Sequence, residues 1–212
     1  MKSLQSLACL FALSLGAATA GLAEGQATPT PPSSPATANA ADPDARERDY
    51  FTDLELVTQD GESVRFFTDV LKDHVVLINF IFTNCGSACP LLTRSLSSVA
   101  DLLGDDMGET VRFISISIDP ERDDPAAMKA FAEKHGANRP GWLFLTGDKA
   151  KIDLVVKKLG QYQPDVEAHS TLVLAGNVPE RHWTKILPNQ PPRAIAERMR
   201  ALMGKGLTAV GG

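Results

Sequence analysis

One apolar run, residues 75–82, constrains the fold of this chain more than any other segment. Its side chains are β-branched, aliphatic or aromatic except for Asn79, and polar residues do not alternate with them. Such a strand is typical of the centre of a sheet that is covered on both faces. The sequence therefore predicts a layered fold with this strand in the middle.

Further strands and helices are expected to alternate with the central strand. We expect a hairpin at 55–66 around Asp60-Gly61, a helical turn at 68–71, strands at 111–118, 142–146 and 171–175, a turn at Gly176-Asn177, a hairpin partner at 183–186, and helices at 90–103, 126–135, 148–159 and 192–203. This order predicts an α/β domain with a single sheet, flanking helices and an N-terminal hairpin.

Two cysteines follow the central strand directly. Cys85 and Cys89 are separated by the small residues Gly86, Ser87 and Ala88, and Pro90 comes next. The pair therefore lies where a strand turns into a helix, at the sheet edge that carries functional loops in α/β folds. Proline favours the first helical position. The helix is thus predicted to begin at Pro90, with its positive end facing the Cys89 sulfur and lowering the pKa of that thiol.

Two sulfurs in such a turn have a limited chemistry. They can close to a disulfide, or they can bind a soft metal ion such as Cu(I). A purely structural disulfide is the simplest alternative, although bridges that close long loops stabilise a fold most.

The N-terminus predicts export. Lys2, an apolar core at 7–16 and small residues at 18–20 form a signal peptide over residues 1–20. The core is short for a membrane span, so anchoring through an uncleaved leader is the less favoured alternative. Cleavage would remove Cys9 and leave Cys85 and Cys89 in a periplasm, where disulfides persist. A periplasmic thiol reductant is therefore an expected partner.

The remaining chain divides by composition. Residues 21–49 are rich in Pro, Ala and Thr and predict a disordered tether. Residues 50–203 predict the folded domain, and 204–212 a flexible tail. The net charge is −5 and no long basic run is present, so no nucleic-acid partner is expected.

Histidine is the natural third ligand, and the chain has 4. We expect His74 in a solvated loop, His135 as a cation at a helix end, and His182 on the surface of a hairpin. His169 differs because it precedes a core strand, whose entry can face the turn after the neighbouring strand. Position alone leaves a ligand and an ordinary loop histidine both open.

Taken together, these motifs resemble the Sco/SenC family of copper-handling proteins. The resemblance covers roughly residues 50–203 and rests on segments 79–83, Cys85-x-x-x-Cys89-Pro90, 117–123, His169-Ser170-Thr171 and 183–186. It implies a thioredoxin-like fold that binds copper, as Cu(I) with Cu(II) as a further state, through Cys85, Cys89 and His169. Asp119 would be a supporting residue.

The resemblance also implies a role. Family members deliver copper to the dinuclear copper site of cytochrome c oxidase, or reduce its thiols, so the expected partner is that copper-site subunit or another copper protein. Many members carry an Asp between the cysteines and another before the histidine; here Gly86-Ser87-Ala88 and Ala168 stand instead. Both changes remove negative charge, which bears on Cu(II) and partner docking more than on Cu(I).

Two enzymatic functions remain open as alternatives to metal delivery. A thiol-disulfide oxidoreductase would use Cys85 and Cys89 in exchange. Proteins resembling thioredoxin usually have two residues between the cysteines and a proline entering the facing strand, whereas this chain has three residues and Ala168-His169-Ser170. A thiol peroxidase would need one activated cysteine beside Thr83 and Arg94.

Overall fold

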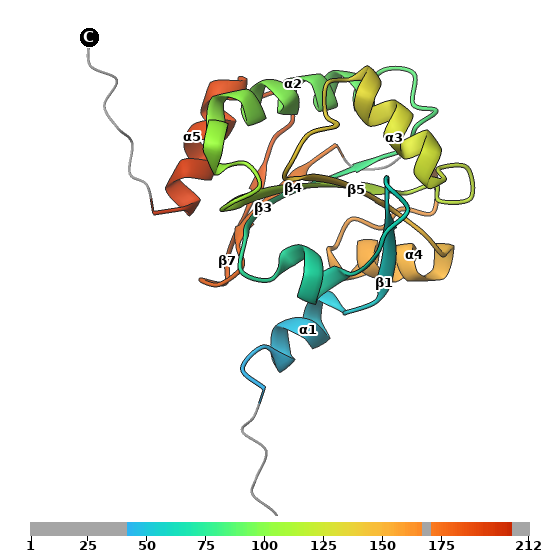
Figure 1. The fold of residues 1–212 in the computed structure, drawn as a ribbon, viewed down its shortest axis with the longest axis horizontal. Helices are drawn as coiled ribbons and strands as arrows, with labels where there is room; N and C mark the ends of the chain where they lie inside the picture. The colour runs from blue at the N-terminus through green and yellow to red at the C-terminus, as the bar shows by residue number, and fades with distance from the viewer. Residues whose placement is uncertain (1–41, 167–170, 205–212) are drawn as a thin grey trace, which may run out of the picture. The chain divides into compact units, whose positions relative to one another are not determined.

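A single mixed sheet organises the protein, seen here in a computed structural model that describes residues 42–166 and 171–204 (Figure 1). The strand order is β2-β1-β5-β4-β3-β6-β7. Strands β3, β4 and β5 are parallel, and the other neighbouring pairs are antiparallel. The strands are β1 (Glu55–Thr58), β2 (Ser63–Arg65), β3 (Val75–Ile81), β4 (Val111–Ser117), β5 (Trp142–Thr146), β6 (Val173–Asn177) and β7 (His182–Ile186).

The central strand prediction is confirmed. Every residue of β3 is buried, and its side chains alternate between two apolar clusters. One cluster is formed with helices α2 (Ala88–Leu103), α3 (Pro125–Lys134) and α5 (Pro192–Leu202). The other is formed with α1 (Ala45–Phe51), α4 (Lys149–Lys158) and the π-helical turn η1 (Phe66–Leu71). Figure 1 shows these two groups of helices on opposite faces of the sheet; the short 3-10 turn η2 (Gly104–Asp106) follows α2.

The helix boundaries follow local signals that were visible in the sequence. The Asp124 side chain accepts the N–H of Ala127 at the start of α3, at 2.7 Å. The Asp148 side chain does the same for α4. A carboxylate at this position also stabilises the positive end of the helix. Gly136 follows α3 with a φ of +71°, the left-handed conformation in which a glycine commonly ends a helix.

The predicted turn at Gly176-Asn177 is wrong, because both residues belong to β6. They pair with Trp183 and His182 of β7, and the turn lies after them. A Cβ on Gly176 would come within 2.5 Å of the Trp183 ring. Glycine is therefore present here to let an indole lie flat against the backbone, a cross-strand contact that the sequence does not reveal.

The predicted end of the tether also needs correction, because helix α1 begins at Ala45 rather than after residue 49. Phe51 anchors this helix by packing against Phe67 and Trp183, with ring centroids 6.4 and 5.0 Å away. The stretch before Phe51 is polar, so it carries little hydrophobic pattern. Helix α1 is therefore stabilised by its contacts with the rest of the fold rather than by its own sequence pattern.

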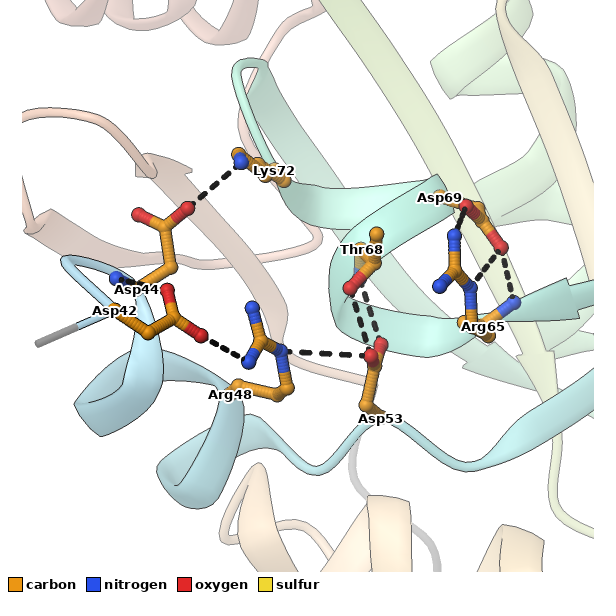
Figure 2. Close-up of polar contacts among 8 residues, drawn as sticks. All are labelled: Asp42, Asp44, Arg48, Asp53, Arg65, Thr68, Asp69 and Lys72. Atoms are coloured by element: carbon orange, nitrogen blue, oxygen red, sulfur yellow. Dashed lines mark hydrogen bonds and ion pairs between the residues drawn. The ribbon is translucent and has the colours of Figure 1, made fainter. Parts of the chain in front are cut away.

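Polar contacts complete the attachment of α1 to the turn η1 (Figure 2). Asp53 accepts hydrogen bonds from the backbone N–H and the hydroxyl of Thr68, at 2.8 and 2.7 Å. Asp53 also pairs with Arg48 of α1 at 3.6 Å, and Lys72 pairs with Asp44 at 2.7 Å. The helix is thus fixed at both of its ends.

The predicted leader (1–20), the predicted tether up to residue 41, His169 and the predicted tail from residue 205 lie outside the described residues. Within the described ranges, no helix has both the length and the hydropathy to cross a bilayer.

We predict that Gly176→Ala lowers the free energy of unfolding by about 1–3 kcal/mol, because the Trp183 ring has to move away from the new methyl group. Gly86→Ala is the matched control, since nothing lies within 4 Å of a Cβ there, and should change stability by less than about 0.5 kcal/mol. Urea unfolding of both variants measures the difference. Equal stabilities would show that the indole is free to move.

Candidate metal and redox site

The cysteine pair lies at the carboxyl end of β3, as predicted, but the helix behind it starts earlier than expected. Helix α2 begins at Ala88, so Cys89 lies in its first turn and Pro90 is the third helical residue. Backbone N–H groups of the first turn have no partner within the helix, so proline costs no helical hydrogen bond there. The prediction that the helix begins at Pro90 is therefore wrong by two residues.

Cys85 receives the hydrogen bonds of the helix start. It is partly exposed, and the backbone N–H of Cys89 donates to its Sγ with 3.4 Å between nitrogen and sulfur. Burial by itself raises the pKa of Cys85, but hydrogen bonds from the backbones of Cys89, Ser87 and Ala88 and from the Cys89 side chain outweigh it and lower the pKa below the usual value. Cys85 is the thiol prepared to ionise.

Cys89 has the opposite character. Its residue is 3% exposed and packs in the apolar cluster beneath α2. Burial, reinforced by the Cys85 sulfur beside it, raises the pKa of Cys89 to about 12. The prediction that the helix lowers the pKa of Cys89 is thus wrong. Because α2 starts early, the side chain of Cys89 turns into the core, and the loop brings Cys85 to the helix amides instead.

The two cysteines are in contact. Neither forms a disulfide in the described part of the chain, and a hydrogen bond joins their side chains. A thiolate at Cys85 therefore has a thiol donor at Cys89. Such a pair can close to a disulfide or offer two sulfur donors to one ion.

A buried carboxylate, Asp123, holds the loop that carries Cys85. It is 1% exposed. Its side chain accepts the Thr83 N–H at 3.1 Å, the Thr83 hydroxyl at 2.5 Å and the Ser117 hydroxyl at 2.6 Å. Its backbone carbonyl accepts the Thr146 hydroxyl at 2.6 Å. These contacts join the ends of β3, β4 and β5, so one residue fixes three neighbouring strand ends.

The sequence predicted Asp119 as the residue that supports the site and did not point to Asp123. Asp119 pairs with Arg122 at 2.6 Å and so organises its own turn. A signal for Asp123 was nevertheless present. Thr83, Ser117 and Thr146 put a hydroxyl at the end of each parallel strand, and hydroxyls that are buried together need a shared acceptor.

Two histidines behave differently from the expectation. His135 is buried, and Arg94 lies 3.2 Å from its Nδ1. Burial, followed by the charges of Arg94 and Lys134, lowers the pKa of His135, so it is a neutral acceptor rather than the predicted cation. His74 is partly buried with its Nδ1 2.6 Å from the carbonyl of Lys72, not solvated. Burial is the main cause that lowers its pKa.

The structure also places the other residues that the sequence analysis considered. His182 is exposed on β7, as predicted. The Thr83 hydroxyl donates to Asp123, and the Arg94 guanidinium lies against His135 Nδ1, so both side chains are engaged by residues other than the cysteines. The arrangement therefore gives no support to a peroxidase.

His169 lies outside the described residues, which resume at Thr171. Among residues 42–166 and 171–204, no three side chains of the metal-binding types come together. The residues on either side are informative. Val166 packs against the same apolar cluster as Cys85. Strand β6 runs antiparallel to β3 with Leu174 opposite Ile78. The start of β6 therefore lies at the end of the sheet where β3 leads into the cysteines.

The chain belongs to the SCO1/SenC family, which it matches over residues 42–204. It is 40% identical over 89 residues to an SCO1 protein homolog of Bacillus subtilis, a match covering 42% of this chain and 45% of that protein. The chain spans about half the length of the curated relatives it matches.

Solved structures support the same assignment. Bradyrhizobium japonicum ScoI with copper bound superposes with a TM-score of 0.59 at 28% identity, covering 70% of this chain and 96% of that one. BsSco, a member of the Sco family of cytochrome c oxidase assembly proteins with a disulfide switch, gives 0.60 at 27% identity, covering 71% and 91%. The predicted thioredoxin-like α/β fold is confirmed.

We predict that iodoacetamide alkylates Cys85 more than about tenfold faster than Cys89 in the reduced, folded protein at pH 7.5, because only thiolates react and only Cys85 has a lowered pKa. The rate at Cys85 should rise with pH towards a midpoint below 9, while Cys89 stays slow. Peptide mass spectrometry separates the two sites. In urea the difference should disappear; equal rates in the folded state would contradict the assignment.

We predict that Asp123→Ala costs about 3 kcal/mol of stability, since buried hydroxyls and an N–H lose their acceptor. Hydrogen exchange of the Thr83 amide should accelerate beyond the effect of global unfolding. Asp124→Ala is the neighbouring control, because it removes only a helix cap, worth about 1 kcal/mol, and should leave the Thr83 amide protected. An unchanged Thr83 exchange rate in Asp123→Ala would mean that the loop is held by other contacts.

Proposed function

We propose that this protein is a periplasmic Cu(I)-binding metallochaperone for the dinuclear copper site of cytochrome c oxidase, with Cys85, Cys89 and His169 as ligands. The observation that carries the proposal is the pair of hydrogen-bonded cysteine thiols at the end of β3 in a chain of the SCO1/SenC family. A related structure, ScoI of Bradyrhizobium japonicum, has copper bound.

The donor set fits a soft ion. Cu(I) prefers thiolate and imidazole ligands, and two sulfurs that already touch require little rearrangement to share it. The lowered pKa of Cys85 favours its thiolate form. Cys89 keeps its proton until metal arrives, because burial raises its pKa to about 12. Binding therefore releases a proton from Cys89, and affinity should increase with pH.

Exposure at the site suits transfer rather than storage. Cys85 is partly exposed whereas Cys89 is buried. An acceptor can therefore approach from the Cys85 side and exchange ligands one at a time, with Cys85 releasing the ion before the buried Cys89. The support for His169 is its place just ahead of β6, whose start lies at the cysteine end of β3.

The location and partners follow from the same chemistry. The predicted leader exports the chain to a compartment where the cysteines oxidise, so a periplasmic thiol reductant has to restore the metal-binding form. The copper acceptor is the copper-site subunit of cytochrome c oxidase or another copper protein.

A second function is favoured by the unequal pKa values of the two thiols. In thiol-disulfide exchange, the Cys85 thiolate attacks a partner disulfide and forms a mixed disulfide, while one partner sulfur leaves. Cys89 then attacks Cys85, its proton passes to the departing partner sulfur, and the Cys85–Cys89 disulfide forms. Two electrons pass to the partner. Its first sulfur leaves as a thiolate that takes a proton from solvent, so the partner is released with two thiols. An accessible thiolate beside a buried thiol suits this sequence.

We predict that His169→Ala weakens Cu(I) binding roughly 100-fold, about 2.7 kcal/mol, because a two-sulfur site loses its third donor. Competition against a chromophoric Cu(I) chelator at pH 7 measures the affinity. His182→Ala is the control, since that imidazole is exposed on β7, and should bind like the unmodified protein. X-ray absorption of the reduced, loaded protein should count two sulfurs and one nitrogen.

The opposite result separates the two functions. Unchanged Cu(I) affinity in His169→Ala, together with intact reduction of a disulfide substrate, would replace delivery by thiol-disulfide exchange. Loss of both activities in Cys85→Ser is expected under either function and serves as the positive control.

A further inference from the structure

A second candidate site lies on the face of the sheet that carries α1 and α4. A cavity of about 620 Å³ opens there between α1, the end of α4 and strands β6 and β7. We call it the α1 groove; it is lined by Arg46, Glu47, Tyr50, Phe51, Lys158, Leu159, Leu174, Val178, Arg181, Trp183, Thr184 and Lys185. Its volume falls within the usual range for small-molecule sites, roughly 300–1,000 Å³.

The α1 groove is separate from the cysteine site. Val178 in its wall donates its N–H to the carbonyl of His74, immediately before β3 begins. The cysteines follow the opposite end of β3, and α2 covers the other face of the sheet. The two sites therefore differ in both face and end, and nothing in the copper chemistry uses the groove.

The floor of the groove is apolar and aromatic. The Phe51 and Trp183 rings lie 5.0 Å apart, and Leu159 and Val178 are buried beside them. Tyr50 stands edge-on to Phe51 at 4.8 Å but remains 61% exposed. An exposed aromatic ring at the mouth of an apolar cavity gains from any flat or aliphatic body that covers it.

The rim of the groove is basic, although the chain is acidic overall with a net charge of −5. Four cationic side chains surround one carboxylate, Glu47, which pairs with Arg181. The Nζ of Lys158 donates to a backbone carbonyl. Arg46 and Lys185 are exposed and form no ion pair with the described residues. The net local charge is therefore positive, and it faces an apolar floor.

The carboxylate of Glu47 is already engaged with the protein. Its Oε1 pairs with Arg181, and its Oε2 is buried, with no hydrogen-bond partner among the described residues. Because Oε2 is out of reach of water, it is also out of reach of a ligand, and the unpaired cations of the rim are the groups left to bind one. A charged side chain on an edge strand can also prevent pairing with another chain. This alternative explains Lys185 on β7, but it does not explain the other cations of the rim.

We propose that the α1 groove binds a free amphipathic organic anion. Its aromatic or aliphatic body covers Phe51 and Trp183, and its carboxylate, sulfonate or phosphate lies between Arg46 and Lys185.

The test uses 8-anilinonaphthalene-1-sulfonate, whose fluorescence increases in an apolar site, and dodecanoate below its micelle concentration as competitor. We expect saturable one-to-one binding to the full chain, energy transfer from tryptophan, and displacement by dodecanoate but not by dodecanol. Added salt should weaken binding.

Charge variants locate the site. The double variant Arg46→Ala/Lys185→Ala removes two cations without breaking an ion pair in the described structure, and should weaken binding about tenfold. The control Lys134→Ala/Arg198→Ala removes two exposed cations from α3 and α5, on the opposite face, and should bind normally. Tyr50→Ala tests the aromatic mouth and should also weaken binding. Circular dichroism confirms that each variant is folded.

Several results would overturn the proposal. These are equal binding by the groove and control variants, equal competition by dodecanol, or binding only to phosphatidylglycerol vesicles, which would make the face a membrane contact. Cys85→Ser/Cys89→Ser should leave the groove titration unchanged, so a failed copper site and a failed groove give different results.

Discussion

The pairing of β3 with β4 on one side and β6 on the other determines where nearly every functional residue lies. The parallel pair brings the end of β3 beside the end of β4, so the cysteine loop and the loop that carries Asp123 meet at one edge. The antiparallel pair brings the start of β6 to that same edge. Burial of β3 on both faces keeps this register, because a slip by one residue would exchange its two apolar faces.

The start of α2 decides the chemistry of the two thiols. Had the helix begun at Pro90, Cys89 would lie at its positive end. Because it begins at Ala88, Cys89 points into the core and the loop returns Cys85 to the free amides. A displacement of two residues thereby exchanges the roles of the sulfurs. Cys85 becomes the partly exposed thiol with the lowered pKa, and Cys89 becomes the buried thiol with the raised pKa.

The two faces of the sheet carry different surfaces. The face beneath α2 contributes the cluster that packs Cys89, and its edge holds the loop fixed by Asp123. The other face holds α1 through Phe51 and leaves the basic, aromatic groove. Gly176 matters to the second surface because it lets the Trp183 ring lie on the backbone of β6. The cysteine site and the groove therefore share a scaffold without sharing residues.

The sequence by itself determined the central strand, the caps at Asp124 and Asp148, the hairpin at Asp60-Gly61 and the position of the cysteine pair, since each depends on a local pattern or a local hydrogen bond. Tertiary structure alone decided the rest. Helix α1 is held to the fold by the buried Phe51 ring, and a glycine is needed at position 176 because the Trp183 indole of another strand lies against it. Asp123 and His135 depend on neighbours 40 or 41 residues away in sequence. The pKa order of the cysteines depends on burial, which no spacing of residues records.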